Sequence, residues 1–234
     1  MIGIICAMQI EADAIRASLE NVKTETVSGV TFTVGRRYGK EIVLAVCGIG
    51  KVFAAVCTEA MILRYAPSLI LNSGVAGTLT SALSIGDIAI SADLVQHDMD
   101  TSPLGDPVGL ISGINKIHFE AETTAVKGLC AAADALGVRY AVGTIASGDQ
   151  FLSDAAKKQW IADTFGAVAC EMEGAAVAQV AYVNGVPFAV LRAISDSATG
   201  DAEMEYPKFV AMAAERSHAI LDAFLASLSV ESKR

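Results

Sequence analysis

The feature that most constrains the fold of this chain is the regular alternation of short apolar segments with longer segments of helical periodicity. The short segments are rich in Ile, Val and Leu, and most are followed by a stretch in which apolar residues recur at helical spacing. Strands that alternate with helices form a largely parallel sheet that helices cover on both faces. We therefore expect an α/β fold, a three-layer sandwich in which helices flank a central, twisted, mixed β-sheet.

These segments follow one another without a linker or an internal repeat, so we expect a single domain over residues 1–234. The expected strands are 2–6, 30–34, 41–46, 69–72, 88–95, 140–147, 168–172 and 188–194. The expected helices are 11–20, 50–65, 122–136, 153–165, 174–183 and 207–228, and an irregular stretch covers 97–113. We expect Ser153 to cap the helix that it opens and Pro207 to begin the last helix.

The charge balance argues against two classes of partner. The chain has 17 Lys and Arg against 26 Asp and Glu, a formal net charge of -9. Binding to a nucleic-acid backbone needs clustered cations, and anionic membranes repel such a chain, so we expect neither as a partner. No apolar run reaches the roughly 18 residues of a membrane-spanning helix, and no basic segment precedes the apolar N-terminus as in a secretory signal. We expect a cytoplasmic protein.

Cysteine usage and the low charge content add two expectations. The five cysteines lie inside apolar runs and show no CxxC spacing, which favours reduced, buried thiols. Charged residues make up only 18% of the chain, below the usual quarter or so. This low fraction indicates that another subunit covers part of the surface.

Carboxylates follow three of the expected strands at the point where each strand ends. Glu11 follows the first strand, Glu171 and Glu173 follow the strand near residue 170, and Asp196 follows the strand near residue 190. A right-handed crossover would make the last two strands parallel, and α/β sheets bind ligands at such carboxyl ends. We expect these acids to surround a nucleoside-sized ligand. Taken singly, Glu11 and Glu173 could face a helix dipole, and Asp196 could stabilise a turn.

The glycine-rich segments do not match the common phosphate-binding patterns. Gly48-Ile-Gly-Lys51 fails the Walker pattern because Val52 follows the lysine, and it fails the dinucleotide fingerprint because Phe53 replaces the third glycine. We expect residues 73–77 and 147–149 to form tight turns at strand ends, where backbone can approach a ligand.

The residues that could hold a metal form a weak pattern. His97, Asp98 and Asp100 share one loop, but a single histidine with two nearby acids is more often a hydrogen-bonded loop. Cys170 has no histidine near it in sequence and is best interpreted as a core thiol. We expect neither a metal nor an organic cofactor.

Six motifs, taken in order, resemble a known family. They are Gly3-Ile-Ile-Cys-Ala-Met-Gln-Ile-Glu11, Gly48-Ile-Gly-Lys51, Asn72-Ser-Gly-Val-Ala-Gly77, Ser147-Gly-Asp149, Glu171-Met-Glu173 and Arg192-Ala-Ile-Ser-Asp196. Together they resemble the 5'-methylthioadenosine/S-adenosylhomocysteine nucleosidases of the nucleoside phosphorylase superfamily. The resemblance spans nearly the whole chain. It implies a homodimer, with loop 97–113 near the partner's site, that uses water to release adenine from thionucleosides without a cofactor.

The resemblance also implies roles for individual residues. Asp196 corresponds to the general acid that protonates adenine at N7, and Glu11 to the base that activates the attacking water. Glu173 and Met172 correspond to residues that bind the ribose. The remaining substrate-binding positions implied by the motifs are Phe151 and Leu152 around the adenine, and Met8, Ile49, Ala76, Gly77, Glu171, Arg192, Ser195 and Tyr206 around the same site.

The reaction itself calls for this arrangement. Breaking an N-glycosidic bond leaves positive charge on the sugar and negative charge on the departing base, so carboxylates near the sugar and a proton donor at the base both help. An aspartate is a weak proton donor at neutral pH, and we expect an apolar enclosure and neighbouring carboxylates to raise the pKa of Asp196. Phe151 is the expected stacking partner of the adenine, although core packing would also explain it.

Two departures from the family leave the preference for the 5' substituent open. Val75 stands where many relatives carry a hydroxyl, and loop 101–107 has few bulky groups. Tyr206 occupies the position of an aromatic over the sugar and adds a hydroxyl. A hydrolase of futalosine-type nucleosides is therefore an alternative, whereas a phosphorylase would need a cation where Glu11 stands. A non-catalytic nucleoside-binding protein and a nicotinamide dehydrogenase fit the acids and the glycines less well.

Overall fold

The computed structural model describes residues 1–197 and 202–228, with the backbone alone at 202–205. Within these residues the strands are β1 (Ile2–Cys6), β2 (Glu20–Val27), β3 (Val30–Arg37), β4 (Lys40–Val46), β5 (Leu69–Thr78), β6 (Ile88–Gln96), β7 (Phe119–Glu120), β8 (Tyr140–Ser147), β9 (Ala167–Glu171) and β10 (Phe188–Asp196). The helices are α1 (Gln9–Ser18), α2 (Lys51–Tyr65), α3 (Thr123–Ala135), α4 (Ala155–Phe165), α5 (Gly174–Val183) and α6 (Ala202–Ser227), with a short 3₁₀ turn at Ser102–Leu104.

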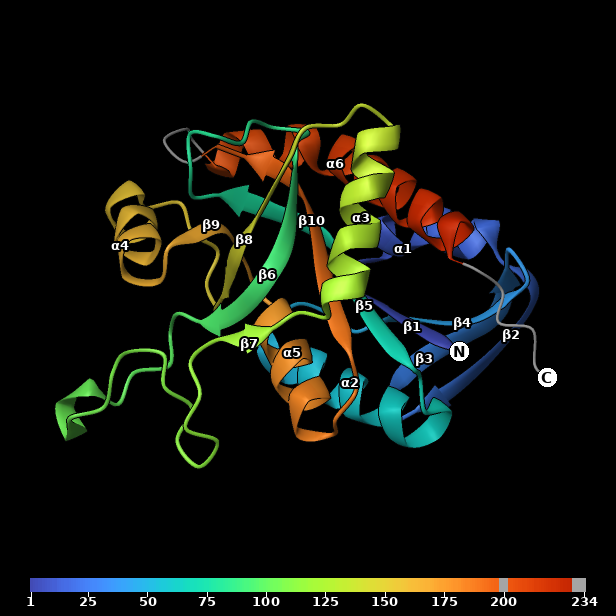
Figure 1. The fold of residues 1–234 in the computed structure, drawn as a ribbon, viewed down its shortest axis with the longest axis horizontal. Coiled ribbons are helices and arrows are strands. Elements are labelled where there is room, and N and C mark those ends of the chain that lie inside the picture. Colours follow the sequence, from blue (N-terminus) through green and yellow to red (C-terminus); the bar gives the residue numbers. More distant parts are fainter. Residues whose placement is uncertain (198–201, 229–234) are drawn as a thin grey trace.

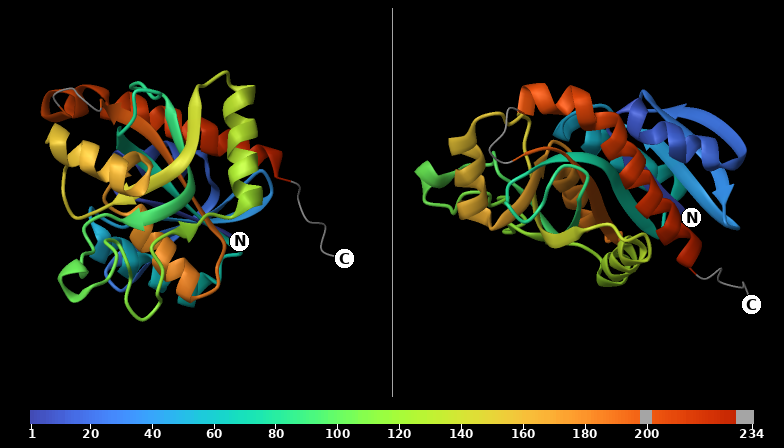
Figure 2. Two further views of the ribbon diagram at one scale, coloured as in Figure 1. Left: turned by 60° about the vertical axis from the view of Figure 1, so that its left-hand side comes forward. Right: turned by 90° about the horizontal axis from the view of Figure 1, so that it is seen from above.

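The strands form one mixed sheet that partly closes on itself. Its order is β10-β6-β8-β9-β5-β1-β4-β3-β2, β7 pairs with β6, and β10 also pairs with β5. The extra pairing joins five strands into a ring, and β1, β4, β3 and β2 extend from it as an open sheet. Helices α1, α3 and α6 pack on one side, and α2 and α5 pack on the other (Figures 1 and 2). The expected α/β fold with a mixed sheet between helices is confirmed.

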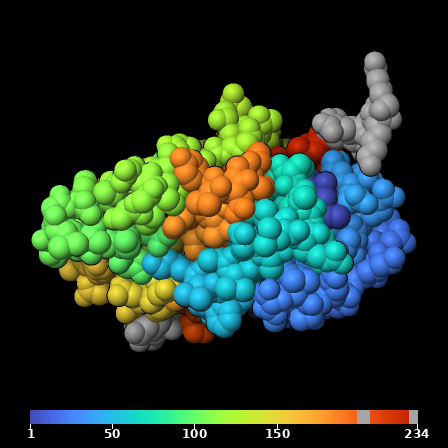
Figure 3. Space-filling model, turned by 90° about the horizontal axis from the view of Figure 1, so that it is seen from below, coloured from blue at the N-terminus to red at the C-terminus, as the bar shows by residue number. Residues whose placement is uncertain are grey.

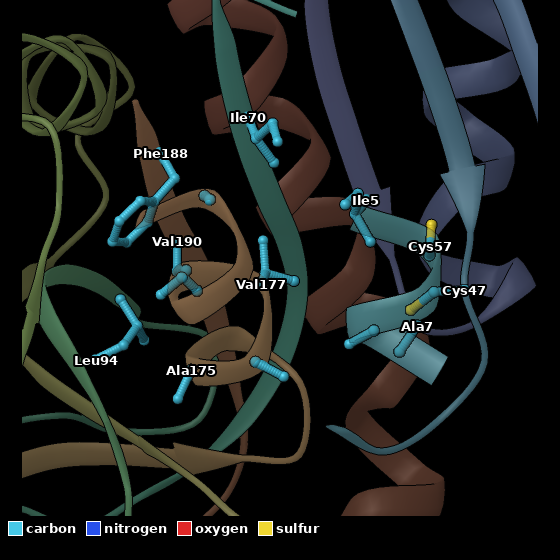
Figure 4. Close-up of a cluster of buried hydrophobic side chains, with 14 of the residues drawn as sticks. Ile5, Ala7, Cys47, Cys57, Ile70, Leu94, Ala175, Val177, Phe188 and Val190 are labelled. Atoms are coloured by element: carbon cyan, nitrogen blue, oxygen red, sulfur yellow. The ribbon is translucent and has the colours of Figure 1, made fainter. Parts of the chain in front are cut away.

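Both faces of the central strands are buried, which explains their continuous apolar runs. Ile5, Ile70 and Val190 pack toward α2 and α5 (Figure 4). Their chain neighbours Ile4, Leu71 and Leu191 lie in a second core beneath α1, α3 and α6. Successive side chains of a strand point to opposite faces, so a strand covered on both faces must be apolar throughout.

The expected parallel arrangement of the strands on either side of α5 is wrong. β9 pairs with β5 antiparallel, through Gly77↔Cys170, whereas β10 pairs with β5 in parallel. β9 and β10 therefore run in opposite directions on either side of β5. The right-handed crossover rule applies only to parallel strands, so it did not govern this connection.

Residues 73–77 also differ from the expectation, because they continue β5 to Thr78 instead of forming a turn. Their glycines serve the site by letting side chains of neighbouring elements approach the strand. Residues 147–149, by contrast, do leave the end of β8.

Three boundaries depart from the prediction. Asp154, and not Ser153, caps α4, since its side chain accepts a hydrogen bond from the Lys157 backbone. Pro207 lies inside α6 and not at its start, so it removes one backbone donor from the helix. The first helix ends at Ser18, and the polar, mostly exposed edge strand β2 follows it.

Candidate active site

A pocket lies where β1, β5 and β10 end and where β9 meets β5. It has a volume of about 340 Å³. All fourteen residues expected at the site line it: Met8, Glu11, Ile49, Ala76, Gly77, Phe151, Leu152, Glu171, Met172, Glu173, Arg192, Ser195, Asp196 and Tyr206. Four further residues line it that were not among the expected site residues, namely Ala7, Val75, Gln150 and Cys170.

Glu11 is fixed in the pocket by backbone donors on two elements. Its Oε2 accepts hydrogen bonds from the Ala7 and Met8 amides, both at 2.9 Å, and its Oε1 accepts one from Val75 at 3.0 Å. Burial raises the pKa of Glu11 above its usual range, against the opposing effect of Arg192. The two interpretations of Glu11 are therefore compatible, because it sits in the first turn of α1 and also lines the pocket.

The two glutamates at the end of β9 have different environments. Glu171 accepts hydrogen bonds from the Glu173 and Gly174 amides at 3.0 and 2.7 Å, and it also contacts the Ser147 hydroxyl and Arg192. Protein donors therefore satisfy the Glu171 carboxylate oxygens, and their hydrogen bonds stabilise the start of α5 beside the pocket. Glu173 accepts one hydrogen bond, from the Gly50 amide at 2.8 Å. Burial and then the charge of Glu171 raise the pKa of Glu173 to about 7.

Arg192 is the cation that holds these acids together. It is fully buried, its Nη2 contacts Glu171 and Asn72, and it lies 3.6 Å from Glu173. A side chain on Gly74 would collide with this guanidinium and would come within 2.5 Å of a Glu11 oxygen. The glycine of β5 is thus required because Arg192 and Glu11 meet over its backbone.

Asp196 is held at the end of β10 by neighbours on three elements. Its Oδ1 accepts a hydrogen bond from the Ser195 hydroxyl at 3.0 Å. A Cβ on Gly77 would lie 2.6 Å from Oδ2, so Asp196 packs directly on the bare backbone of β5. Lys158 of α4 donates to Oδ2 at 3.1 Å. We expected carboxylates beside Asp196, and the structure places an ammonium group there instead.

Lys158 was not among the expected site residues, although its position in the sequence carries a signal. Lys158, Ile161 and Phe165 are the buried residues of α4, at positions i, i+3 and i+7 of one helical face. A lysine on an otherwise apolar helical stripe is rarely buried without a partner. Its spacing alone could have directed attention to a carboxylate beneath α4.

The outer part of the pocket is aromatic and apolar. The rings of Phe151 and Tyr206 meet edge to face, with centroids 5.6 Å apart. The Tyr206 hydroxyl lies 3.2 Å from the Met8 sulfur. Phe151 and Ile49 are about half exposed, at 49% and 55%. This side of the pocket can stack a flat heterocycle and accept an apolar substituent.

The two aspartates of the loop after β6 have separate partners, and His97 contacts neither of them by a hydrogen bond in the described residues. Asp98 pairs with Lys51 at 2.6 Å, Asp100 accepts the Ser102 amide at 2.8 Å, and His97 is buried against Gly148. Within residues 1–197 and 202–228, no group of three or more His, Cys, Asp or Glu side chains is placed to hold a metal ion. The same residues contain no helix long and apolar enough to cross a membrane.

Comparison with known proteins places this geometry in a family. The family model of the phosphorylase superfamily matches residues 1–226. A 5'-methylthioadenosine/S-adenosylhomocysteine nucleosidase of Shewanella halifaxensis is 36% identical over 229 residues, which cover 97% of this chain and 99% of the relative.

Two solved structures show the same fold. The nucleosidase of Neisseria meningitidis, in complex with methylthio-immucillin-A, has a TM-score of 0.93 at 33% identity and covers 97% of this chain and 99% of its own. A futalosine hydrolase of Helicobacter pylori has a TM-score of 0.93 at 36% identity, with 97% of each chain covered. This chain therefore belongs to the phosphorylase superfamily and, within it, to the family of 5'-methylthioadenosine/S-adenosylhomocysteine nucleosidases.

Proposed function

We propose that this protein is an N-glycosyl hydrolase that releases adenine from 5'-methylthioadenosine and S-adenosylhomocysteine, with a 5-thioribose as the second product. The observation that carries the proposal is the convergence of Glu11, Glu173 and Asp196 on one pocket. Each is at most 4% exposed, and the aromatic side chains Phe151 and Tyr206 line the same pocket. A buried, acid-lined site of this kind favours a reaction that develops positive charge on a sugar.

In this mechanism Asp196 donates a proton to N7 of the adenine as the N-glycosidic bond breaks. Protonation makes the base a better leaving group, and the electron pair of the bond departs with it. Glu11 takes a proton from a water molecule that attacks the anomeric carbon. Its raised pKa makes it a stronger base than an exposed glutamate, and three backbone amides fix its orientation.

Glu173 binds the ribose hydroxyls and stabilises the positive charge of the sugar. It retains an unfilled acceptor capacity on the pocket side, whereas Glu171 is occupied by protein donors. Met172 packs against the sugar ring. Phe151 and the backbone at Leu152 frame the adenine, and Ile49, Met8 and Tyr206 enclose the 5' substituent.

Water rather than phosphate is the nucleophile in this proposal. Among the described residues that line the pocket, Arg192 is the one cationic side chain, and its guanidinium is already paired with carboxylates. Glu11 at the end of β1 would repel a phosphate dianion. A phosphorylase site needs cations that are free to bind the anion.

A second copy of the chain completes the site in our proposal. Exposed apolar side chains gather on α2 and α5, which lie side by side on the face shown in Figure 3. They include Val52, Leu63 and Val183, which are 73%, 76% and 64% exposed. Such a patch is typical of a subunit interface, and the half-exposed Ile49 and Phe151 would be covered by loop 97–113 of the partner. Sedimentation as a monomer at micromolar concentration would contradict the dimer.

We also propose that the protein acts in the cytoplasm. All five cysteines lie in the described residues and are free thiols, and four of them are buried. Burial raises the pKa of the Cys47 and Cys170 thiols, so both stay protonated and unreactive at neutral pH. Such thiols suit a reducing compartment.

The substrate class can be tested with four nucleosides. We expect purified protein to release adenine from methylthioadenosine and S-adenosylhomocysteine, and not to release hypoxanthine from inosine at a comparable rate. Aminofutalosine tests the second candidate function, which the similarity to the Helicobacter pylori futalosine hydrolase favours. Release of no base from any of the four would overturn the proposal that the protein is an enzyme of this class.

A further inference from the structure

We propose that Lys158 is a positioning residue for the reaction: it holds the Asp196 carboxylate in place, and its charge affects how the rate depends on pH. The inference rests on the proposed function, in which Asp196 is the general acid. Lys158 does not itself line the pocket, and in this proposal it supports the reaction through its contact with Asp196.

The burial of Lys158 is the first observation. It is 2% exposed, on the face of α4 that also buries Ile161 and Phe165. Its ammonium group donates to Asp196 Oδ2 at 3.1 Å and to the Ser197 carbonyl at 2.8 Å. Asp196 is the last residue of β10, and Ser197 follows it. Lys158 therefore links α4 to the segment that carries the general acid.

The second observation is that Lys158 supplies the third restraint on the Asp196 carboxylate. The Ser195 hydroxyl binds Oδ1, and the bare backbone at Gly77 limits the space beside Oδ2. Without Lys158, Oδ2 would lose this donor, and the carboxylate would be less firmly held. Misplacement of a general acid by a fraction of an ångström weakens proton transfer, because the donor must lie within hydrogen-bond reach of N7.

The third observation concerns charge. Three titratable groups on three elements interact with Asp196, namely Lys158 from α4, Cys170 from β9 and Tyr206 from α6. Lys158 is the cation of this group. A cation beside a carboxylate favours its ionised form, whereas a general acid must carry a proton. Lys158 therefore places a positive charge 3.1 Å from the carboxylate that must carry the proton, so we expect removal of this charge to change how the rate depends on pH.

The test uses neutral and charged replacements of Lys158 in the full-length protein. Lys158→Met and Lys158→Gln remove the charge, and Lys158→Arg keeps it. Lys157→Met is the matched control, because its ammonium lies 4.0 Å above the Trp160 ring and away from Asp196. For each protein, kcat/KM for methylthioadenosine is measured from acid to alkaline pH, together with the melting temperature.

We expect the fall of kcat/KM at high pH to move upward by about one to three pH units in the two neutral variants. It stays in place in Lys158→Arg and Lys157→Met. A purely structural lysine would change the melting temperature and leave the position of this limb unaltered. An unmoved limb in a folded neutral variant overturns the proposal.

Two further measurements keep the outcomes distinct. Asp196→Asn tests the proposed function alone, since full activity in that variant removes Asp196 as the acid whatever Lys158 does. If neither neutral variant folds, the infrared difference between wild type and Asp196→Asn follows protonation of Asp196 directly. The carboxyl band is then titrated in the ligand-free wild type. A protonation midpoint above the ordinary value of about 3.9 contradicts the proposal, and a midpoint below it supports the proposal.

Discussion

Replacing Glu173 by glutamine tests the electrostatics of the pocket, because we expect the variant to be more stable than wild type and yet less active. In the folded protein, burial and the charge of Glu171 raise the pKa of Glu173 from 4.5 to about 7. The carboxyl in the unfolded chain retains its ordinary pKa. Between these two values the folded state binds the additional proton, so the contribution of Glu173 to stability is lost as the pH rises from about 4.5 through about 7.

The size of the effect follows from the size of the shift. A rise from 4.5 to about 7 corresponds to a loss of up to about 3 kcal/mol of unfolding free energy above pH 7, at 1.36 kcal/mol per unit. Glutamine does not ionise, and its amide oxygen can still accept the hydrogen bond from Gly50. The variant therefore avoids the loss. For a chain of this size, 3 kcal/mol corresponds to a rise of about 6 to 12 °C in melting temperature.

The measurement is unfolding by urea or heat at pH 5 and at pH 8.5, for wild type and Glu173→Gln. We expect the variant to be more stable at pH 8.5 and nearly equal at pH 5, while adenine release falls because the ribose contact is lost. The exposed Glu41→Gln is the control and should change stability by less than about 0.5 kcal/mol at either pH. A Glu173→Gln variant that is less stable than wild type at pH 8.5 would refute the reasoning.

Three further substitutions test the separate parts of the site. We expect Asp196→Asn to lower kcat at least about a hundredfold in the folded protein, as for loss of a general acid, and near-normal turnover would remove Asp196 from that role. Glu11→Gln should lower kcat by about 10² to 10⁴, because glutamine cannot accept the proton of the attacking water. Unchanged single-turnover kinetics would contradict this prediction. Gly74→Ala should destabilise the fold by about 1 to 3 kcal/mol, since its Cβ meets Arg192 and Glu11, and a wild-type melting curve would contradict that steric argument.

Much of the architecture could be predicted from local patterns. The apolar runs of β1, β5 and β10 indicated strands buried on both faces, and the structure confirms two cores, one on each side of the sheet. The edge strand β2 was missed because its sequence is polar and its side chains are mostly exposed, so it has neither an apolar run nor clear alternation. Its one partner strand in the sheet described is β3.

The residues that line the pocket could also be predicted from the sequence. The hydrogen bonds and ion pairs that join these residues could not. All fourteen expected residues line the pocket, and eleven of them come from five of the six motifs, which lie where strands end or helices begin. Which acids are occupied by protein donors depends on contacts between distant segments, such as the Gly50 amide with Glu173 or Lys158 with Asp196. The direction of β9 relative to β10 likewise depends on pairing with β5, which no local pattern encodes.

The central claim is that water, held by Glu11, attacks a sugar whose adenine Asp196 protonates. The most direct measurement is adenine release from methylthioadenosine by the wild-type protein, in buffer freed of phosphate and again at high phosphate, with the sugar product identified by mass spectrometry. The account predicts equal rates in the two buffers and free methylthioribose as the product. A rate that requires phosphate, with a methylthioribose 1-phosphate product, would contradict it.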